Sequence, residues 1–294
     1  MKLIGGILKS IRPHQWIKNL FLFAGIVFSG QFFHPDAFVR SIAGFIAFCA
    51  LASGTYLLND VVDIESDRAH PDKKNRPIAS GIVPVGLSVA VGIALLFGGL
   101  AISFGLGSRF LAISAGYVFL QLLYIFLLKN QPVLDILAVS AGFVIRAAAG
   151  GIVIDVPISS WLLVCTSLLA LFLVTEKRRQ ELARIEIENG ELQSRPSLRN
   201  YSVGFLDNMA MIEIAATMVA YMLYVFSVET RAKFGYGMGA TIPFVFYGFF
   251  RYLWLVHIKG KGEAPTKIFL TDISSIINLF FWGFTVFIIV YLTK

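Results

Sequence analysis

The residues best suited to chemistry form an acidic segment that begins at Asn59. Asp60, Asp63 and Asp67 follow at spacings of three and four residues. On an α-helix this spacing places the three carboxylates on one face, with Asn59 at its edge. Three unpaired negative charges on one face repel one another, so a cation is expected among them. Hard oxygen ligands suit Mg²⁺, which binds carboxylates, waters and substrate phosphates. The segment therefore predicts a magnesium site formed by Asp60, Asp63 and Asp67.

Basic residues follow the acidic segment directly. They are Arg68, Lys73, Lys74 and Arg76. Lys73 and Arg76 are predicted to bind phosphate oxygens, because ammonium and guanidinium donors suit such oxygens and a guanidinium can bind them bidentately. The alternative is a solvated loop in which acids and bases only neutralise one another, but the regular spacing of the acids favours a phosphate site. His70 is expected to be structural or a phosphate donor rather than a catalytic base.

The composition requires that these residues lie on membrane-embedded helices. The chain of 294 residues is 57% hydrophobic and only 15% charged, with a mean hydropathy of +0.75. A soluble fold of this size would not bury so much apolar surface. The apolar runs are continuous, whereas barrel strands alternate over about ten residues, so the fold class is all-α and polytopic. Cys49 and Cys165 fall within apolar runs and are expected to be small core residues.

Nine apolar stretches have about the 17 to 25 residues that a helix needs to cross a hydrocarbon core. They are residues 17–33, 37–58, 84–104, 109–128, 132–152, 159–175, 208–228, 239–257 and 276–292. The rest of the chain leaves no room for a separate soluble domain. We therefore expect a single integral membrane domain over residues 1–294.

The distribution of cations predicts the orientation. With the N-terminus in the cytoplasm, 18 of the 25 Lys and Arg residues lie on the cytoplasmic side, as the positive-inside tendency requires. The acidic segment lies on the same side, so the active site is expected to face the cytoplasm across the plasma (inner) membrane. Topology accounts for the net charge of +7 and no nucleic acid partner is needed. The oligomeric state stays open, and a homo-oligomer is one assembly that the sequence allows.

Ionisable residues also occur within the expected spans. Asp135 and Arg146 are eleven residues apart in the fifth span, which returns to nearly the same helix face. Because charges at membrane depth are costly unless paired, both are expected to point into the bundle. Arg146 is either a substrate ligand or a structural partner of a carboxylate or carbonyl, and Arg251 offers the same alternatives. The small residues Ala147 to Gly151 are expected to permit close helix packing.

The acidic segment resembles a known motif. Asn59, Asp60, Asp63 and Asp67 match the Asn-Asp-x-x-Asp-x-x-x-Asp motif of the UbiA-type membrane prenyltransferase superfamily. Members of that superfamily carry it after the second of nine transmembrane helices. The resemblance implies a nine-helix bundle in which the motif binds Mg²⁺ and, through the metal, the diphosphate of a substrate.

A second charged segment runs from Glu176 to Glu181 and departs from the common pattern of the superfamily. Aromatic prenyltransferases of the superfamily usually have an Asp-x-x-x-Asp pair after the sixth helix, but here Lys177 and Glu181 have that spacing. An ammonium in place of a carboxylate favours extra phosphate charge over a second metal. The arrangement Lys177-Arg178-x-x-Glu181 resembles the branch of polyprenyl-phosphate (decaprenyl-phosphate) phosphoribosyltransferases. Other stretches similar to this branch are residues 12–19, 67–71, 76–79, 144–151 and 251–252.

This resemblance implies a transfer of 5-phosphoribose from 5-phosphoribosyl 1-diphosphate to a polyprenyl (decaprenyl) phosphate, with release of diphosphate and a place in cell wall biogenesis. Glu181 would make a further metal or ribose contact, and Asn59 would orient or assist the metal ligands. The diphosphate, the ribose 5-phosphate and the lipid phosphate would be divided among four cations, which are Lys73, Arg76, Lys177 and Arg178. Arg12 and Lys18, before and at the start of the first span, would meet the lipid phosphate.

Two other functions fit part of the pattern. An aromatic prenyltransferase of the same fold would use the first motif identically and move a prenyl group from a prenyl diphosphate to an aromatic acceptor, but its second acidic pair is missing. A secondary transporter of phosphorylated lipids or sugars would also use intramembrane Arg residues. The acids of this chain lie at helix ends rather than at the midplane, which disfavours a transporter.

Overall fold

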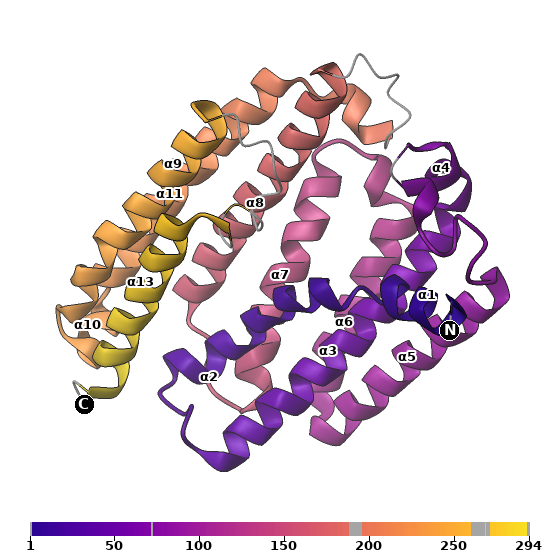
Figure 1. Ribbon diagram of the computed structural model, residues 1–294. Helices are drawn as coiled ribbons and strands as arrows, with labels where there is room; N and C mark the ends of the chain where they lie inside the picture. The colour runs from indigo at the N-terminus through magenta and orange to yellow at the C-terminus, as the bar shows by residue number, and fades with distance from the viewer. Residues whose placement is uncertain (1, 72, 188–195, 260–267, 269–270, 293–294) are drawn as a thin grey trace. The chain divides into compact units, whose positions relative to one another are not determined.

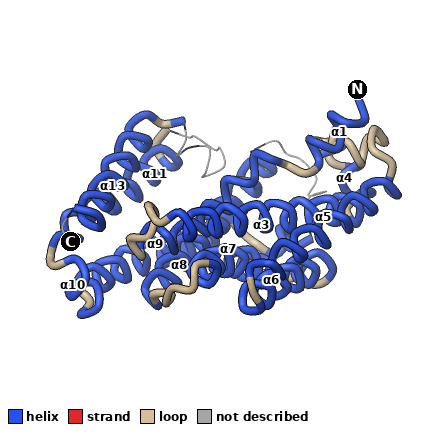
Figure 2. Tube along the Cα trace, turned by 90° about the horizontal axis from the view of Figure 1, so that it is seen from below, coloured by secondary structure: helices blue, strands red, loops and turns tan. Residues whose placement is uncertain are grey.

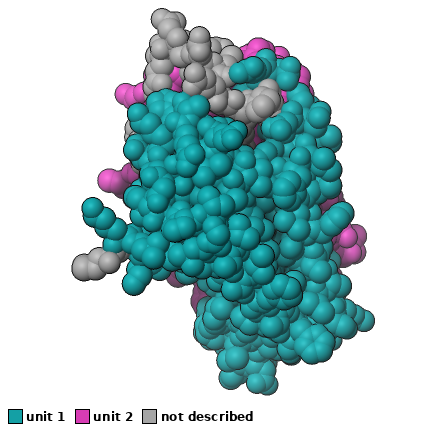
Figure 3. Space-filling view, turned by 90° about the vertical axis from the view of Figure 1, so that its right-hand side faces the viewer, with its two compact units in different colours: residues 1–158, 191–200 teal, residues 159–190, 201–294 magenta. Residues whose placement is uncertain are grey.

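The described part of the chain is helical throughout its regular elements. The computed structural model describes residues 2–71, 73–187, 196–259, 268 and 271–292. Every regular element in these ranges is an α- or a 3₁₀-helix (Figure 2), which confirms the all-α expectation. The chain divides into two compact units, Met1–Ile158 with Glu191–Asn200 and Ser159–Gly190 with Tyr201–Lys294 (Figure 3). The expectation of a single domain stays a prediction.

Unit 1 is built around two buried helices. Its elements, with η for 3₁₀-helices, are α1 (Lys2–Ser10), η1 (Pro13–Phe23), α2 (Ala24–Phe28), α3 (Pro35–Val62), α4 (Ile64–Ala69), η2 (Lys73–Asn75), α5 (Val85–Leu106), α6 (Ser108–Phe126), η3 (Leu128–Asn130), α7 (Leu134–Val153) and η4 (Pro196–Asn200) (Figure 1). In α3 and α7, 61% of the most apolar stretch of 18 residues is buried, whereas in α5 and α6 the buried share of that stretch is 17% and 22%. The apolar outer faces of α5 and α6, with Phe97, Phe104 and Phe119 exposed, are suited to contact with lipid.

The acidic segment continues α3 with one interruption. Asp63 ends α3 with φ −90° and ψ 7°, and α4 begins at Ile64. The amide of Asp63 donates to the carbonyl of Asn59 at 2.9 Å, and the amide of Asp67 donates to the carbonyl of Asp63 at 2.8 Å. The helical path therefore runs on past Asp67, as the spacing of the acids predicts.

The first expected span, residues 17–33, differs from the prediction. It contains most of the 3₁₀-helix η1 and the short helix α2 instead of one continuous α-helix. The chain passes very close to α7 here, because a Cβ on Gly150 would lie 1.8 Å from the carbonyl oxygen of Leu22, and one on Gly25 would lie 2.6 Å from the backbone of Gly150. This contact confirms that the small residues of α7 permit close packing.

Unit 2 contains the remaining helices. They are α8 (Ser160–Ile187), α9 (Val203–Phe226), α10 (Val228–Phe234), η5 (Gly237–Thr241), α11 (Ile242–His257) and α13 (Ile273–Leu292). Helix α8 packs along α9, and α11 packs on both α9 and α13. Phe172 of α8 meets Phe249 and Tyr252 of α11 with ring centroids 5.4 and 5.2 Å apart, so aromatic contacts form part of the core of this unit.

Eight helices of the described chain are long and apolar enough to cross a membrane. They correspond to the second through ninth expected spans, and they include η5 joined to α11 as Gly237–His257. The expected count of nine is not confirmed, and the difference lies in residues 17–33.

Arg251, within one of these spans, has a structural partner. Its Nη2 and Nε donate to the two carboxylate oxygens of Asp272 at 2.9 and 3.1 Å. Asp272 also accepts from the amide and the hydroxyl of Ser275, both at 3.0 Å, and so caps the N-terminus of α13. The hydrogen bond from Arg251 lowers the pKa of Asp272 to about 2.

We predict that Asp272→Asn lowers the thermal midpoint of unit 2 near neutral pH by roughly 2–4 °C, because the amide keeps the cap but loses the ion pair. A carboxyl with a lowered pKa stabilises the fold above its unfolded pKa of about 3.9, and this contribution disappears as the pH falls through about 2. Unfolding of the detergent-purified protein between pH 7 and 2 should therefore show the two proteins converging at the acid end. A difference that is constant over this range would contradict the assignment.

Candidate active site

The aspartates of the acidic segment are buried and share a guanidinium. Asp60 is 2% exposed and Asp67 is 3% exposed, while Asp63 is half-buried. Nη1 of Arg76 donates to Oδ1 of Asp60 at 3.0 Å and to Oδ2 of Asp67 at 2.7 Å. The structure thus joins Arg76 to the acids that precede it, as one partner of two carboxylates.

Arg12 reaches the same carboxylate from the N-terminal segment. Its Nη2 donates to Oδ1 of Asp60 at 2.5 Å, and its guanidinium lies 5.3 Å from the centre of the Tyr56 ring. The backbone of Arg12 is left-handed, with φ 52° and ψ 62°, a conformation that non-glycine residues adopt at a cost. The surrounding contacts must therefore hold Arg12 in place.

Lys129 is a third cation in contact with the acidic segment, and the sequence did not single it out. Its ammonium, in η3, pairs with Oδ1 of Asp63. Asn59 donates from Nδ2 to the other oxygen of Asp63 at 3.0 Å. Lys129 lies in the short segment between the fourth and fifth expected spans, which is predicted to be on the same side of the membrane as the acids. This position could have indicated from the sequence that Lys129 is near them.

The acids and cations form a balanced set. Asp60, Asp63 and Asp67 carry three negative charges, and Arg12, Arg76 and Lys129 carry three positive charges in contact with them. Within the described ranges no group of three His, Cys, Asp or Glu side chains has the arrangement of a metal site. The donors still fit a hard divalent ion, because they are carboxylates and the recorded cation contacts of Asp60 and Asp67 each use one oxygen.

The N-terminal segment is fixed on the face of α3 that carries Asp60. Ser53 donates from Oγ to the carbonyl of Ile11 at 2.9 Å and accepts from Nε1 of Trp16 at 3.0 Å. Ser53, Tyr56 and Asp60 are spaced by three and four residues and therefore share one face of the helix. Ser53 thus fixes the residue directly before Arg12.

Arg146 connects this segment to α6 and α7. Its guanidinium donates to Oδ1 of Asn19 at 2.7 Å, to the carbonyl of Gly142 at 2.8 Å and to the hydroxyl of Tyr117 at 2.7 Å. Arg146 is 4% exposed and Asp135 is fully buried, which confirms that both point inward. The contacts of Arg146 match the structural alternative, with a carbonyl, an amide oxygen and a phenol as partners.

The other predicted residues of unit 1 lie in the loop after α4 and in the middle of η1. His70 accepts from the amide of Lys73 at 3.4 Å through Nδ1, which favours a structural role for His70. Lys73 and Lys18 are half-buried. Partial burial, with the positive charges of Arg12 and Lys18, lowers the pKa of His14, so the start of η1 is electropositive.

The second charged segment lies on α8 in unit 2. Lys177 is exposed and Arg178 is buried. Nη1 of Arg178 lies 3.4 Å from Oε2 of Glu181, whose side chain is 25% exposed. The structure therefore brings Arg178 and Glu181 together within one helical turn, with Lys177 directed to the surface of the unit.

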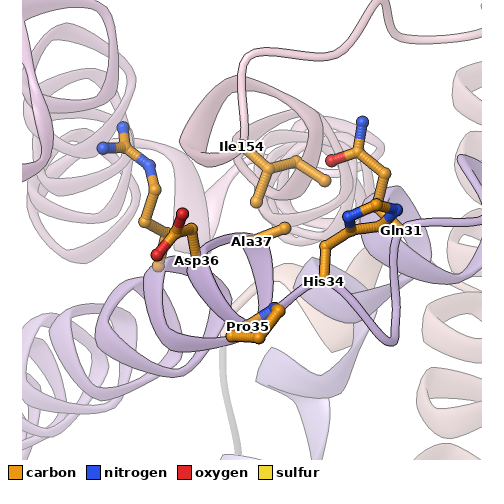
Figure 4. A pocket seen from close by; sticks show the side chains of 7 residues that line it. Gln31, His34, Pro35, Asp36, Ala37 and Ile154 are labelled. Carbon is orange, nitrogen blue, oxygen red and sulfur yellow. The ribbon is translucent and has the colours of Figure 1, made fainter.

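One cavity of unit 1 lies away from the acidic segment. It has a volume of about 330 Å³ and is lined by Gln31, His34, Pro35, Asp36, Ala37, Arg40 and Ile154 (Figure 4). It sits at the N-terminal end of α3, and Asp36 and Asp60 are about 36 Å apart along the helix at 1.5 Å per residue. Arg40 uses its guanidinium to hold helix ends, donating to the carbonyls of Val153 and Leu106 at 2.7 and 2.9 Å. This cavity is therefore separate from the candidate site.

Comparison with known proteins places the chain in a family. Residues 19–284 match the family model of the UbiA prenyltransferase family. The chain belongs to this family, and with its eight apolar helices it is a multi-pass membrane transferase.

The chain is also similar to individual members of this family. The chain is 40% identical over 229 residues to a decaprenyl-phosphate phosphoribosyltransferase of Mycolicibacterium smegmatis, covering 76% of this chain and 71% of that one. It is 33% identical to the decaprenyl-phosphate phosphoribosyltransferase of Corynebacterium glutamicum, covering 99% of this chain and 88% of the relative. Among solved structures, a UbiA homolog from Archaeoglobus fulgidus bound to GPP and Mg²⁺ has the same fold, with a TM-score of 0.73, 16% identity and coverage of 97% and 99%.

We predict that Ser53→Ala loosens the N-terminal segment, because the carbonyl of Ile11 and the indole of Trp16 lose their shared partner. Loss of about 1 to 1.5 kcal/mol of hydrogen bonding corresponds to roughly tenfold faster amide exchange in residues 11–19, measured by hydrogen–deuterium exchange. Ser140→Ala is the matched control, since the buried hydroxyl of Ser140 donates to the carbonyl of Ile136 in its own helix. Equal exchange in both variants would show that Ser53 does not hold this segment.

Proposed function

We propose that this protein transfers 5-phosphoribose from 5-phosphoribosyl 1-diphosphate to a polyprenyl phosphate, such as decaprenyl phosphate, and releases diphosphate. The observation that carries the proposal is the 33% identity to the Corynebacterium glutamicum phosphoribosyltransferase over 99% of this chain and 88% of that one. The replacement of the second acidic pair by Lys177 and Glu181 supports the same substrate class, because it suits a substrate that carries more phosphate charge.

The chemistry makes stabilisation of the leaving group the main requirement. Departure of diphosphate from C1 of the ribose leaves an oxocarbenium-like centre and concentrates negative charge on the diphosphate. Asp60, Asp63 and Asp67 are the residues that would hold Mg²⁺, and the bound ion would supply charge neutralisation at that leaving group. The acceptor phosphate is already anionic near neutral pH, so the reaction needs no strong general base.

The cations that contact the aspartates are suited to receive the phosphate charge. Arg12, Arg76 and Lys129 are in contact with carboxylates at the site where the diphosphate would arrive. On substrate binding, their N–H groups would donate to phosphate oxygens instead of carboxylate oxygens, because both kinds of oxygen accept hydrogen bonds from guanidinium and ammonium groups. Asn59 would keep Asp63 oriented during this exchange through its hydrogen bond to Oδ2.

The remaining site residues complete the substrate contacts. Lys73, Lys177 and Arg178 would bind the ribose 5-phosphate and the lipid phosphate. Lys18, in η1, would meet the lipid phosphate, and Glu181 would contact the ribose or a further metal. For Arg146 we propose an indirect role in substrate binding, because it fixes Asn19 and so the segment that carries Arg12 and Lys18.

The cation distribution of the sequence supports a cytoplasmic active site at the plasma membrane. Phosphoribosyl diphosphate is a soluble anion and would enter from that side, while the polyprenyl phosphate would come from the bilayer. A homo-oligomer is compatible with this arrangement.

The reaction can be tested directly. Purified protein incubated with Mg²⁺, decaprenyl phosphate and labelled phosphoribosyl diphosphate should move label into the organic phase. EDTA should abolish the transfer, because the diphosphate would lose its counter-charge. Prenyl transfer from an allylic diphosphate to 4-hydroxybenzoate, without phosphoribosyl transfer, would favour the aromatic prenyltransferase alternative.

Substitutions test the assigned residues in the same assay. Asp63→Ala and Lys177→Ala should each lower kcat/KM by at least about 10²-fold, because each removes a charge from the stabilisation of the leaving group or of the bound phosphates. Asp36→Ala and Lys233→Ala are matched controls, since both side chains are exposed and lie outside the candidate site. Wild-type activity in Asp63→Ala would refute the metal assignment, and wild-type activity in Lys177→Ala would refute the phosphate assignment.

A further inference from the structure

Unit 2 contains a second group of buried acids, which the proposed reaction does not use. Glu176 is fully buried on α8, and Gln180 lies one turn later on the same helix with 7% exposure. Glu213, on α9, is also 7% exposed. These side chains lie on helices that are long and apolar enough to cross a membrane, and a buried polar group without a partner is costly.

Two sets of hydrogen bonds involve these side chains. Tyr252 of α11 donates to Oε2 of Glu176 at 3.0 Å and accepts from Nε2 of Gln180 at 2.9 Å. Thr175 donates to Oε1 of Glu213 at 3.0 Å. Because Thr175 adjoins Glu176 in the chain, the two carboxylates lie on the same stretch of the contact between α8 and α9.

Each of the three side chains has one oxygen that accepts no hydrogen bond from the described residues. Oε1 of Glu176, Oε1 of Gln180 and Oε2 of Glu213 are buried and have no hydrogen-bond partner among the described residues. All three atoms are acceptors, and one of them is an amide oxygen, which a proton does not neutralise. Buried polar atoms are nearly always satisfied, so these oxygens point to a missing positive group.

Three arginines of this unit form ion pairs with other carboxylates. Arg178 pairs with Glu181 at 3.4 Å, Arg179 with Asp207 at 2.5 Å and Arg251 with Asp272 at 2.9 Å. No ion pair among the described residues includes Glu176 or Glu213. Two ionised carboxylates therefore leave two negative charges in a low-dielectric region, where burial of uncompensated charge is strongly unfavourable.

We propose that Glu176, Gln180 and Glu213 bind a small divalent cation between α8 and α9. Two carboxylates and an amide carbonyl are hard oxygen ligands of the kind that Mg²⁺ and Ca²⁺ prefer, and a charge of two balances both acids. Glu176 and Gln180 belong to the second charged segment, but they are buried, whereas Lys177 is exposed and Glu181 is half-buried on the same helix, so the site uses other side chains than those assigned to the substrate. It would tie α8 to α9, and it does not depend on the proposed reaction.

Binding of Mn²⁺ to the full-length, metal-stripped protein in detergent tests the site. The variant Asp60→Asn/Asp63→Asn/Asp67→Asn removes the carboxylates of the acidic segment, and it should still bind one Mn²⁺ per chain in equilibrium dialysis with electron paramagnetic resonance detection. Adding Glu213→Gln should weaken this binding by at least about tenfold, since loss of a ligand costs no less than loss of a supporting residue. Adding Glu229→Gln, the same change at an exposed acid of α10, should leave it intact.

The outcomes separate the cation from its alternatives. Absence of Mn²⁺ in the triple variant, or equal affinity after Glu213→Gln, would overturn the proposal. If the triple variant cannot be purified, the thermal midpoint of the otherwise unchanged protein decides: the rise that Mn²⁺ causes relative to EDTA should be smaller in Glu213→Gln than in Glu229→Gln, because both variants keep the acidic segment. An equal rise in the two variants would overturn the proposal. A midpoint that responds to pH and not to Mn²⁺ would show a protonated carboxyl pair instead. Transferase activity is not read here, so this test is independent of the proposed function.

Discussion

The pairing of Asp60 with two guanidinium groups is the interaction on which the candidate site depends. Asp60 is almost fully buried and receives Arg12 at 2.5 Å and Arg76 at 3.0 Å. These cations come from the N-terminal segment and from the loop after α4, so one carboxylate joins two distant parts of the chain. A buried acid without such partners would be strongly destabilising, which explains why both segments are held against α3.

Equal numbers of acidic and basic side chains suit a site where the acids would bind Mg²⁺ and the bases would bind the diphosphate. The three aspartates and the three cations in contact with them carry equal and opposite charges, and addition of Mg²⁺ with a diphosphate would bring both a cation for the acids and an anion for the bases. Each group would then change partner without being left alone in a low-dielectric environment. The left-handed Arg12 and its supports, Ser53 and Trp16, hold one of these bases in place before substrate arrives.

The sequence predicts much of this because the strongest patterns are local. The spacing of Asp60, Asp63 and Asp67 requires only helical geometry, and apolar length alone finds the spans from residue 35 onward. Residues 17–33 failed as one helix because their conformation depends on contact with glycines of α7, far away in the chain. Lys129 and Ser53 were missed for the same reason, since their roles come from tertiary contacts. Glu176 and Glu213 have no shared motif, and only packing of α8 on α9 brings them together.

Equilibrium binding of labelled phosphoribosyl diphosphate, without any acceptor lipid, tests most directly whether the aspartates hold a metal–diphosphate. Binding to the wild-type protein should require Mg²⁺, and either EDTA or Asp60→Asn should weaken it by more than about tenfold, since each removes part of the ion-mediated contact. Binding of equal affinity with EDTA, or in Asp60→Asn with Mg²⁺, would contradict a role of this acidic segment in holding the diphosphate.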